Sequence, residues 1–311
     1  MLKAPHDQRR IILGTDWQTD CDDAAAIRIL AWAHSHKVID LSGISIDSAV
    51  DCSVSSLRAF LKCEGIGEVP VAIDHHSYDY GGPARYQPRL SAMEADPYQN
   101  DDCEDSVRLY RRLLANAEGK TDIIEIGFCQ VLAALLESGP DEYSPLRGED
   151  LVRQKVGKLW IMGGDWSKDR GREFNFSHKP KASRAISAVL KRCPVEVVLL
   201  GHEVGVNVVS GGVLASIHPR DVLYQIMCDW GAPNGRSSWD PLTAYLACVG
   251  NVEKCGYSLV RGTASVDAQT GENSFAPSPA GKHGYVVKNL ADSEYEQMLN
   301  EILLAHGKRN R

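Results

Sequence analysis

Four aspartates lie within eight residues near the N-terminus, and carboxylates at this density can bind a cation. They are Asp16, Asp20, Asp22 and Asp23, in the run IILGTDWQTDCDDAAA. That run contains no lysine or arginine, so no neighbouring basic residue in the sequence offsets the repulsion between the four charges. Ligation by oxygen atoms alone favours a hard ion. The pattern therefore predicts a Ca²⁺ or Mg²⁺ site.

A helix cap, an EF-hand loop or a phosphatase motif would account for less of this acidic run. Capping of a following helix requires one or two acids at its N-terminus, and not readily four. An EF-hand loop beginning at Asp16 needs glycine at its sixth position and glutamate at its twelfth, where the chain has Cys21 and Ile27. A phosphatase of the haloacid dehalogenase type requires D-x-D, and Gln18 occupies the second acidic position.

The elements that must position these acids follow from hydrophobic periodicity. Short apolar runs predict strands at Arg10–Thr15, Val38–Ile46, Val69–Ile73, Asp122–Gly127, Lys158–Gly163 and Val195–Gly201. Segments with helical spacing separate most of them, and a final helix is predicted at Asp292–His306. Continuously apolar strands alternating with amphipathic helices indicate a parallel sheet covered on both faces.

We therefore expect an α/β fold with a mostly parallel central β-sheet flanked by helices, forming a single domain over residues 1–311. In such a sheet ligands bind at the carboxyl ends of the strands, and the acidic run follows the first strand. Three long polar stretches, 74–103, 164–180 and 229–241, are predicted to be functional loops.

Composition restricts the partners and the compartment. The net charge of −7 argues against a nucleic-acid partner or an anionic membrane surface. The nine cysteines include no C-x-x-C pair, so neither a zinc cluster nor a thioredoxin-like motif is expected. With several cysteines in apolar runs, and no apolar run of about 18 residues, we expect a soluble cytoplasmic protein with reduced thiols. Self-association into a homo-oligomer is compatible with the sequence.

Several ordered segments together resemble the inosine–uridine-preferring nucleoside hydrolase family, of which the chain looks like a divergent member. The first, GTDWQTDCDDA from Gly14, resembles the family's D-x-D-x-G-x-D-x-D-D-A signature. The others are IGFCQVLA from Ile126, KLWIMGG from Lys158, the E-[FY]-N match Glu173-Phe174-Asn175, and SWDPL from Ser238. The matches span roughly residues 10 to 245, and no one of them alone would be specific.

The resemblance implies a nucleoside hydrolase-like fold with a tightly bound Ca²⁺ at the floor of its cavity. Asp16 would be the general base and a metal ligand, with Asp23, Asp240 and the backbone carbonyl of Gln130 as further ligands. The substrate-binding residues would be Asp22, Glu173, Phe174, Asn175 and Trp239.

The function implied is calcium-dependent hydrolysis of N-glycosidic bonds in ribonucleosides or related N-ribosides, with Asp16 activating a metal-bound water. The partner would be a small-molecule nucleoside or N-riboside. Nearby carboxylates suit this reaction because its transition state resembles an oxocarbenium ion. Two alternatives stay open: a catalytically impaired nucleoside- or sugar-binding protein of the same fold, and a metal-dependent phosphohydrolase.

The chain departs from the family pattern at several positions. Gly14 stands where many members carry another Asp, and Gln130-Val131 replaces a T-N pair. The G-N after the second strand is missing, and Asp47 or Ser48 could replace its substrate contact. Trp239 takes the place of a histidine that protonates the leaving base in many members.

Further side chains could supply the leaving-group chemistry or the base contacts. Candidate acids are His75, His76, His178 and His202, with Glu203 as a further residue placed after a predicted strand. Candidate aromatic contacts for a nucleobase are Trp17, Trp166, Phe174, Trp230 and Trp239.

Overall fold

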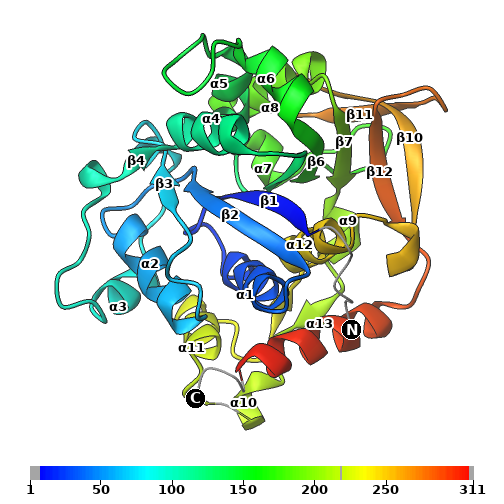
Figure 1. Cartoon of the computed structure of the whole chain (residues 1–311). Coiled ribbons are helices and arrows are strands. Elements are labelled where there is room, and N and C mark those ends of the chain that lie inside the picture. The colour runs from blue at the N-terminus through cyan, green and yellow to red at the C-terminus, as the bar shows by residue number, and fades with distance from the viewer. Residues whose placement is uncertain (1–7, 218, 308–311) are drawn as a thin grey trace.

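A ten-stranded sheet runs through the centre of the protein, in a computed structural model that describes residues 8–217 and 219–307 (Figure 1). Its strands are β1 (Arg9–Thr15), β2 (Ile39–Ile46), β3 (Val71–Ile73), β4 (Glu104–Asp105), β5 (Thr121–Glu125), β6 (Val156–Met162), β7 (Glu196–Leu200), β10 (Tyr257–Val266), β11 (Asn273–Pro277) and β12 (His283–Lys288). The spatial order is β11-β10-β12-β7-β6-β5-β1-β2-β3-β4. From β4 to β12 every neighbouring pair is parallel, and β10 is antiparallel to both β11 and β12. The mostly parallel α/β prediction is confirmed.

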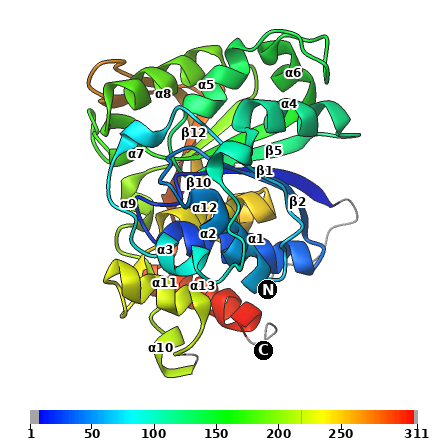
Figure 2. The same ribbon diagram turned by 90° about the vertical axis from the view of Figure 1, so that its left-hand side faces the viewer.

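Helices cover both faces of this sheet (Figures 1 and 2). One face carries α1 (Asp22–Ser35), α2 (Ser53–Cys63), α11 (Val222–Trp230), α12 (Trp239–Val249) and α13 (Asp292–Gly307). The other carries α4 (Ser106–Asn116), α5 (Gln130–Glu137), α6 (Gly148–Lys155) and α8 (Pro180–Arg192). Ile11 and Leu13 of β1 pack into the first core and Ile12 into the second. This alternation between two cores is the reason that the strand is continuously apolar.

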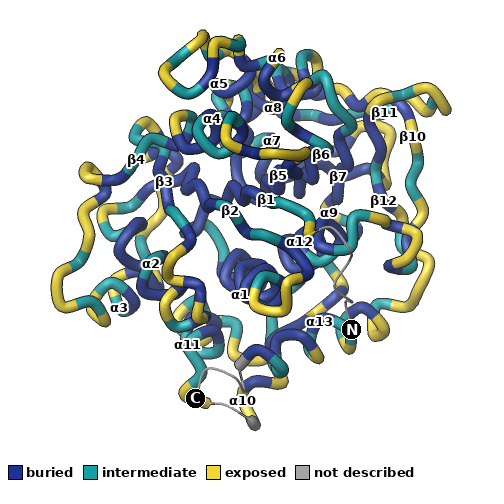
Figure 3. Tube along the Cα trace, in the orientation of Figure 1, coloured by how far each residue is buried: buried dark blue, intermediate teal, exposed yellow. Residues whose placement is uncertain are grey.

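The residues of the central strands are mostly buried, and exposed residues concentrate at the periphery (Figure 3). Short elements occupy the connections: η1 (Tyr78–Tyr80), α3 (Gln87–Ser91), η2 (Asn100–Asp102), α7 (Phe174–Ser177), α9 (His202–Gly205), α10 (Leu214–Ile217), η3 (Glu253–Cys255) and the pair β8 (Val209–Ser210) and β9 (Arg236–Ser237). None of the helices within the described ranges is long and apolar enough to cross a membrane.

The six predicted strands correspond to β1, β2, β3, β5, β6 and β7, with ends shifted by a few residues. The predicted final helix is α13, one residue longer than expected. The three polar stretches are less open than predicted, because they contain α3, α7 and the first turn of α12. The antiparallel end of the sheet, β10 to β12, was not predicted. It lies at the edge, where β10 alternates buried and exposed residues rather than forming an apolar run.

Candidate active site

A cavity of about 530 Å³ opens at the carboxyl edge of the parallel strands. It lies beside β1 and β5, where the chain order along the sheet changes direction, as expected for a ligand site in an open α/β sheet. Eight of the nine predicted site residues line it: Asp16, Asp22, Asp23, Glu173, Phe174, Asn175, Trp239 and Asp240. Gln130 does not.

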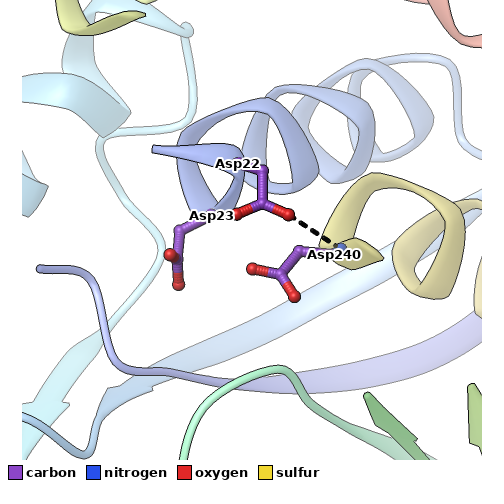
Figure 4. A group of neighbouring side chains, drawn as sticks. All are labelled: Asp22, Asp23 and Asp240. Atoms are coloured by element: carbon purple, nitrogen blue, oxygen red, sulfur yellow. Dashed lines mark hydrogen bonds between the residues drawn. The ribbon is translucent and has the colours of Figure 1, made fainter. Parts of the chain in front are cut away.

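Three buried carboxylates meet at the N-termini of two helices (Figure 4). Asp22 and Asp23 begin α1, and Asp240 lies in the first turn of α12. One carboxylate oxygen from each lies within 4.8 Å of the others, and the Asp240 backbone amide donates to Asp22 Oδ2 at 3.2 Å. Both helix N-termini favour negative charge, which lowers the cost of bringing the acids together.

Small side chains bring these two helix ends into proximity. α1 and α12 pack against each other, and the first core contains Ala24 and Ala31 of α1 with Ala244 and Ala247 of α12. Alanine has little volume, so two helices meeting through alanines approach closely. The alanine-rich sequence after the acidic run thus places Asp240 beside residues more than 200 positions earlier.

Asp16, which lines the cavity, is followed by a strained backbone turn at Trp17. Trp17 has a φ of 46°, a left-handed conformation that is uncommon for a bulky residue. Its buried ring packs 5.4 Å from both Phe60 and Tyr86, and its indole Nε1 donates to Ser56 Oγ at 2.9 Å. These contacts hold the strained turn in place. Trp17 is therefore a core residue, and its predicted contact with a nucleobase is wrong.

The protein offers the four buried acids Asp16, Asp22, Asp23 and Asp240 too little positive charge for all of them to ionise together. Burial, opposed by a hydrogen bond from Thr19, raises the pKa of Asp16 to about 7. Burial and then the neighbouring carboxylates raise the pKa values of Asp22, Asp23 and Asp240 well above the usual range. Asp23 Oδ2 is buried and has no hydrogen-bond partner within the described residues. An oxygen-rich, buried and partly unsatisfied donor set fits a hard divalent cation.

Asp20 differs from the other three aspartates. Its carboxylate accepts hydrogen bonds from Arg236 at 2.9 and 2.5 Å, and Arg236 also lies 5.1 Å from the ring centre of Trp239. The acidic run contains no basic residue, and the basic partner of Asp20 is Arg236 in β9, far away in the sequence. This pairing compensates Asp20 and leaves Asp16, Asp22, Asp23 and Asp240, within the described part of the chain, without such a partner.

Glu173 and Asn175 project from a tight turn into the same cavity. Glu173 caps α7, where its carboxylate accepts from the amides of Gly164 at 3.1 Å and Asn175 at 2.8 Å. Burial raises the pKa of Glu173 to about 7. The Asn175 amide donates to the carbonyls of Ile126 at 3.2 Å and Met162 at 3.3 Å, across the ends of two strands. Both side chains are buried and oriented by backbone groups, as expected of residues that recognise hydroxyls.

Gly14 leaves room for an acid from the next strand. A Cβ atom at Gly14 would overlap the carboxylate of Glu125, and one at Gly127 would overlap that of Asp47. Both acids are fully buried, and burial raises both pKa values, that of Glu125 to about 7. The carboxylate missing at position 14 is thus replaced by Glu125, and Asp47 lies with it behind the cavity rather than lining it.

Gln130 is directed away from the cavity. It is the first residue of α5, and its side chain binds the Asp47 carbonyl, Asp74 and the Tyr80 hydroxyl. Ile126 lines the cavity instead. The predicted metal ligand was the backbone carbonyl of Gln130 and not its side chain, so this role stays a prediction.

The remaining candidates separate into two groups. Phe174, Trp230, Trp239 and His202 line the cavity, whereas Trp166, His75, His76, His178 and Glu203 do not. Trp166 is buried against Phe176, Phe275 and Tyr285, and its amide donates to Glu203. His202 stacks on Trp239 with ring centres 5.4 Å apart. Lys168, Arg172 and Arg236 also line the cavity, although no sequence motif indicated them.

The buried acids predict an unusual dependence of stability on pH in a metal-chelating buffer. Asp16 and Glu173 have folded-state pKa values near 7, above their values of 3.8 and 4.5 in the unfolded chain. The folded state therefore binds more protons, and its stability is greatest below about pH 4 with respect to these groups and falls as pH rises to 7. Thermal unfolding in EDTA should give a lower Tm at pH 7.5 than at pH 5. Calcium should remove most of this difference, and a Tm rising with pH in EDTA would contradict the charge analysis.

Comparison with known proteins shows which class of proteins shares this fold. No family model matches the sequence, and no curated protein sequence matches it. Solved structures do match. An inosine–uridine preferring nucleoside hydrolase from Bacillus anthracis has 15% identity and a TM-score of 0.72, covering 97% of this chain and 100% of that one. A purine-preferring ribonucleoside hydrolase from Gardnerella vaginalis has 16% identity and a TM-score of 0.71, with 97% and 100% covered. The type III effector XopQ, complexed with adenosine diphosphate ribose, has 16% identity and a TM-score of 0.69, with 97% and 95% covered.

The structure is therefore an α/β domain whose carboxylate-lined cavity lies at the carboxyl edge of a mostly parallel sheet. More particularly, its fold is that of the nucleoside hydrolases. The expected family resemblance is confirmed in the fold, at 15 to 16% identity to these structures.

Proposed function

We propose that the protein is a calcium-dependent hydrolase of N-glycosidic bonds in ribonucleosides or related N-ribosides. The observation that carries this proposal is the approach of Asp240 to Asp22 and Asp23 beside Asp16, at the floor of a cavity that Glu173 and Asn175 also line. The nucleoside hydrolases of the same fold support the reaction class. Asp16, Asp23 and Asp240 would hold the ion.

When bound, calcium would orient and polarise the attacking water and the ribose hydroxyls. Asp16 accepts the proton of that water, a role suited to a buried carboxylate that lines the cavity beside the proposed metal ligands. Asp22, Glu173 and Asn175 bind the sugar hydroxyls and fix the anomeric carbon near Asp16. The buried carboxylates also stabilise the positive charge that develops on the ribose as the bond to the base breaks.

The leaving base departs toward the wall formed by Trp230, Trp239 and His202. The two indole rings offer surfaces for stacking a nucleobase. Of the four candidate histidines only His202 lines the cavity, so it is the best placed of the four to protonate the leaving group.

His202→Ala should therefore distinguish leaving groups. We expect kcat for nucleosides to fall by about 10²-fold or more, because a general acid contributes on that order. Turnover of p-nitrophenyl riboside should change by less than about two-fold, since its leaving group departs without protonation. His76→Ala, on an exposed loop outside the cavity, is the matched control. An equal loss on both substrates would assign His202 a structural role.

The defining experiment measures ribose release from a nucleoside panel and from p-nitrophenyl riboside, with calcium and after its removal. Turnover of the nitrophenyl compound alone would support an intact floor with an unusual base pocket. The replacement of the family's histidine by Trp239 favours one alternative, a nucleoside- or sugar-binding protein without turnover. Ribose binding with no hydrolysis of any substrate would establish that alternative. Phosphate release with Mg²⁺, insensitive to Asn175→Ala, would instead identify a phosphohydrolase.

All nine cysteines are free, which supports a reducing compartment such as the cytoplasm.

A further inference from the structure

The cavity contains basic residues that a neutral nucleoside does not require. Lys168, Arg172 and Arg236 line it together with the acidic floor. Two of them already have carboxylate partners: Arg236 binds Asp20, and Lys168 binds Asp165 at 2.6 Å. Arg172 is exposed, and within residues 8–217 and 219–307 it has neither a hydrogen bond nor an ion pair. It is thus the uncompensated cation of the cavity wall.

Arg172 lies next to residues proposed to bind the sugar of the substrate. It directly precedes Glu173, and the segment from Arg172 to Asn175 alternates exposed and buried residues. Glu173 and Asn175 are buried and hydrogen-bonded to backbone groups, Arg172 and Phe174 are exposed, and all four line the cavity. A cation at this place lies beside the residues proposed to bind the sugar hydroxyls. The indole wall, Trp230 and Trp239, comes from other elements, α11 and α12.

A ribose held at the floor has two further substituents, the base at C1′ and the exocyclic carbon at C4′. These leave the ring on opposite sides of its oxygen atom. With the base against the indole wall, the 5′ carbon would extend away from that wall, and Arg172, next to the sugar-binding Glu173, would be the basic residue placed to meet it. The ammonium of Lys168 uses one of its donors on Asp165, and the guanidinium of Arg172 has all its donors available to a ligand. Guanidinium groups bind phosphate through two parallel hydrogen bonds.

We propose that the preferred substrates are 5′-phosphorylated N-ribosides, such as nucleoside 5′-monophosphates, with Arg172 as the phosphate contact. This inference rests on the proposed function. Water adds its oxygen to C1′ as the C1′–N bond breaks, one proton of the water goes to Asp16, and the departing base takes up a proton from His202. The proton on Asp16 then passes to solvent, and solvent reprotonates the exposed His202. The products are the free base and ribose 5-phosphate, so no additional reactant is needed.

Arg172→Ala tests this assignment against Arg170→Ala, two residues away. Arg170 is exposed, binds Glu272 and does not line the cavity. We expect wild type to have a higher kcat/KM for each 5′-monophosphate than for the matching nucleoside. Arg172→Ala should lower kcat/KM for the monophosphates by about 10- to 100-fold, as expected for two charge-assisted hydrogen bonds, and change nucleoside turnover by less than about two-fold. Arg170→Ala should alter neither.

The two proposals fail in different ways. Hydrolysis of nucleosides with no preference for monophosphates, or equal loss on both in Arg172→Ala, would overturn the phosphate assignment and leave the hydrolase intact. If no substrate is hydrolysed, calorimetry with ribose 5-phosphate and ribose in the presence of calcium still decides. Binding of ribose 5-phosphate at least ten-fold tighter than ribose, lost in Arg172→Ala, would support the phosphate site. Equal affinities would reject it.

Discussion

Asp16→Asn is expected to lower kcat for ribose release by about 10²- to 10⁴-fold, the contribution of a well-placed general base. The substitution preserves the shape of the side chain and removes the proton acceptor. Asp16 is buried, follows β1 directly and lines the cavity beside the Asp22–Asp23–Asp240 cluster. The loss should appear equally with nucleosides and p-nitrophenyl riboside, because attack by water is common to both.

Two measurements separate this result from misfolding. Circular dichroism and thermal unfolding in EDTA should show a variant at least as stable as wild type, since one buried carboxylate has been neutralised. Asp51→Asn, an exposed substitution before α2, should retain wild-type kcat. Retention of more than a tenth of the wild-type kcat in Asp16→Asn would exclude Asp16 as the base.

Asp240→Ala should abolish the response of the protein to calcium. For wild type, calcium at 100 times its dissociation constant adds about 2.7 kcal/mol to the free energy of unfolding. Without Asp240 the three-carboxylate group loses one member, and this stabilisation should largely disappear together with bound metal and ribose release. In EDTA the variant should be no less stable than wild type, because repulsion from Asp22 and Asp23 is relieved.

Asp105→Ala is the matched control for Asp240→Ala. Asp105 caps α4 through the amides of Val107 and Arg108, and it does not line the cavity. Its loss should cost about 1 kcal/mol in EDTA and in calcium alike. Metal content and the calcium-dependent change in Tm are the measurements. Unchanged metal content in Asp240→Ala would contradict both the hydrolase and the binding-protein hypotheses, which require a ligand so distant in sequence.

The strands and the acidic floor were predictable because local patterns encode them. Continuous apolar runs identified β1 to β7 apart from the two-residue β4, and the density of carboxylates identified the cavity floor. Placing Asp240 with Asp22 depended on the family resemblance, since no local pattern relates segments so far apart. The edge strands β10 to β12 lack a continuous apolar run, because one side of β10 remains exposed.

Predictions about single residues of the site depended on contacts between distant segments, which the sequence alone does not show. Trp17 was a candidate contact for a nucleobase, but its ring is buried in the core against Phe60 and Tyr86. Gln130 was assigned by motif alignment; its side chain binds Asp47, Asp74 and Tyr80, and the predicted role of its backbone carbonyl stays a prediction. Arg236 reaches Asp20 only through folding, so the acidic run appeared less compensated than it is.

The Glu125 carboxylate occupies the space beside Gly14, and this arrangement constrains how the site can change by mutation. A side chain at position 14 would compete for the space of the Glu125 carboxylate. Replacing Gly14 with aspartate alone would force two acids into one volume, and shortening Glu125 alone would leave a void and no acid. One arrangement has Gly14 with Glu125, and the other has an aspartate at position 14 with a small residue at position 125. A change from one to the other by single mutations therefore passes through an impaired intermediate. Strongly non-additive effects, with the double variant Gly14→Asp/Glu125→Ala fitter than either single one, are the signature of such epistasis.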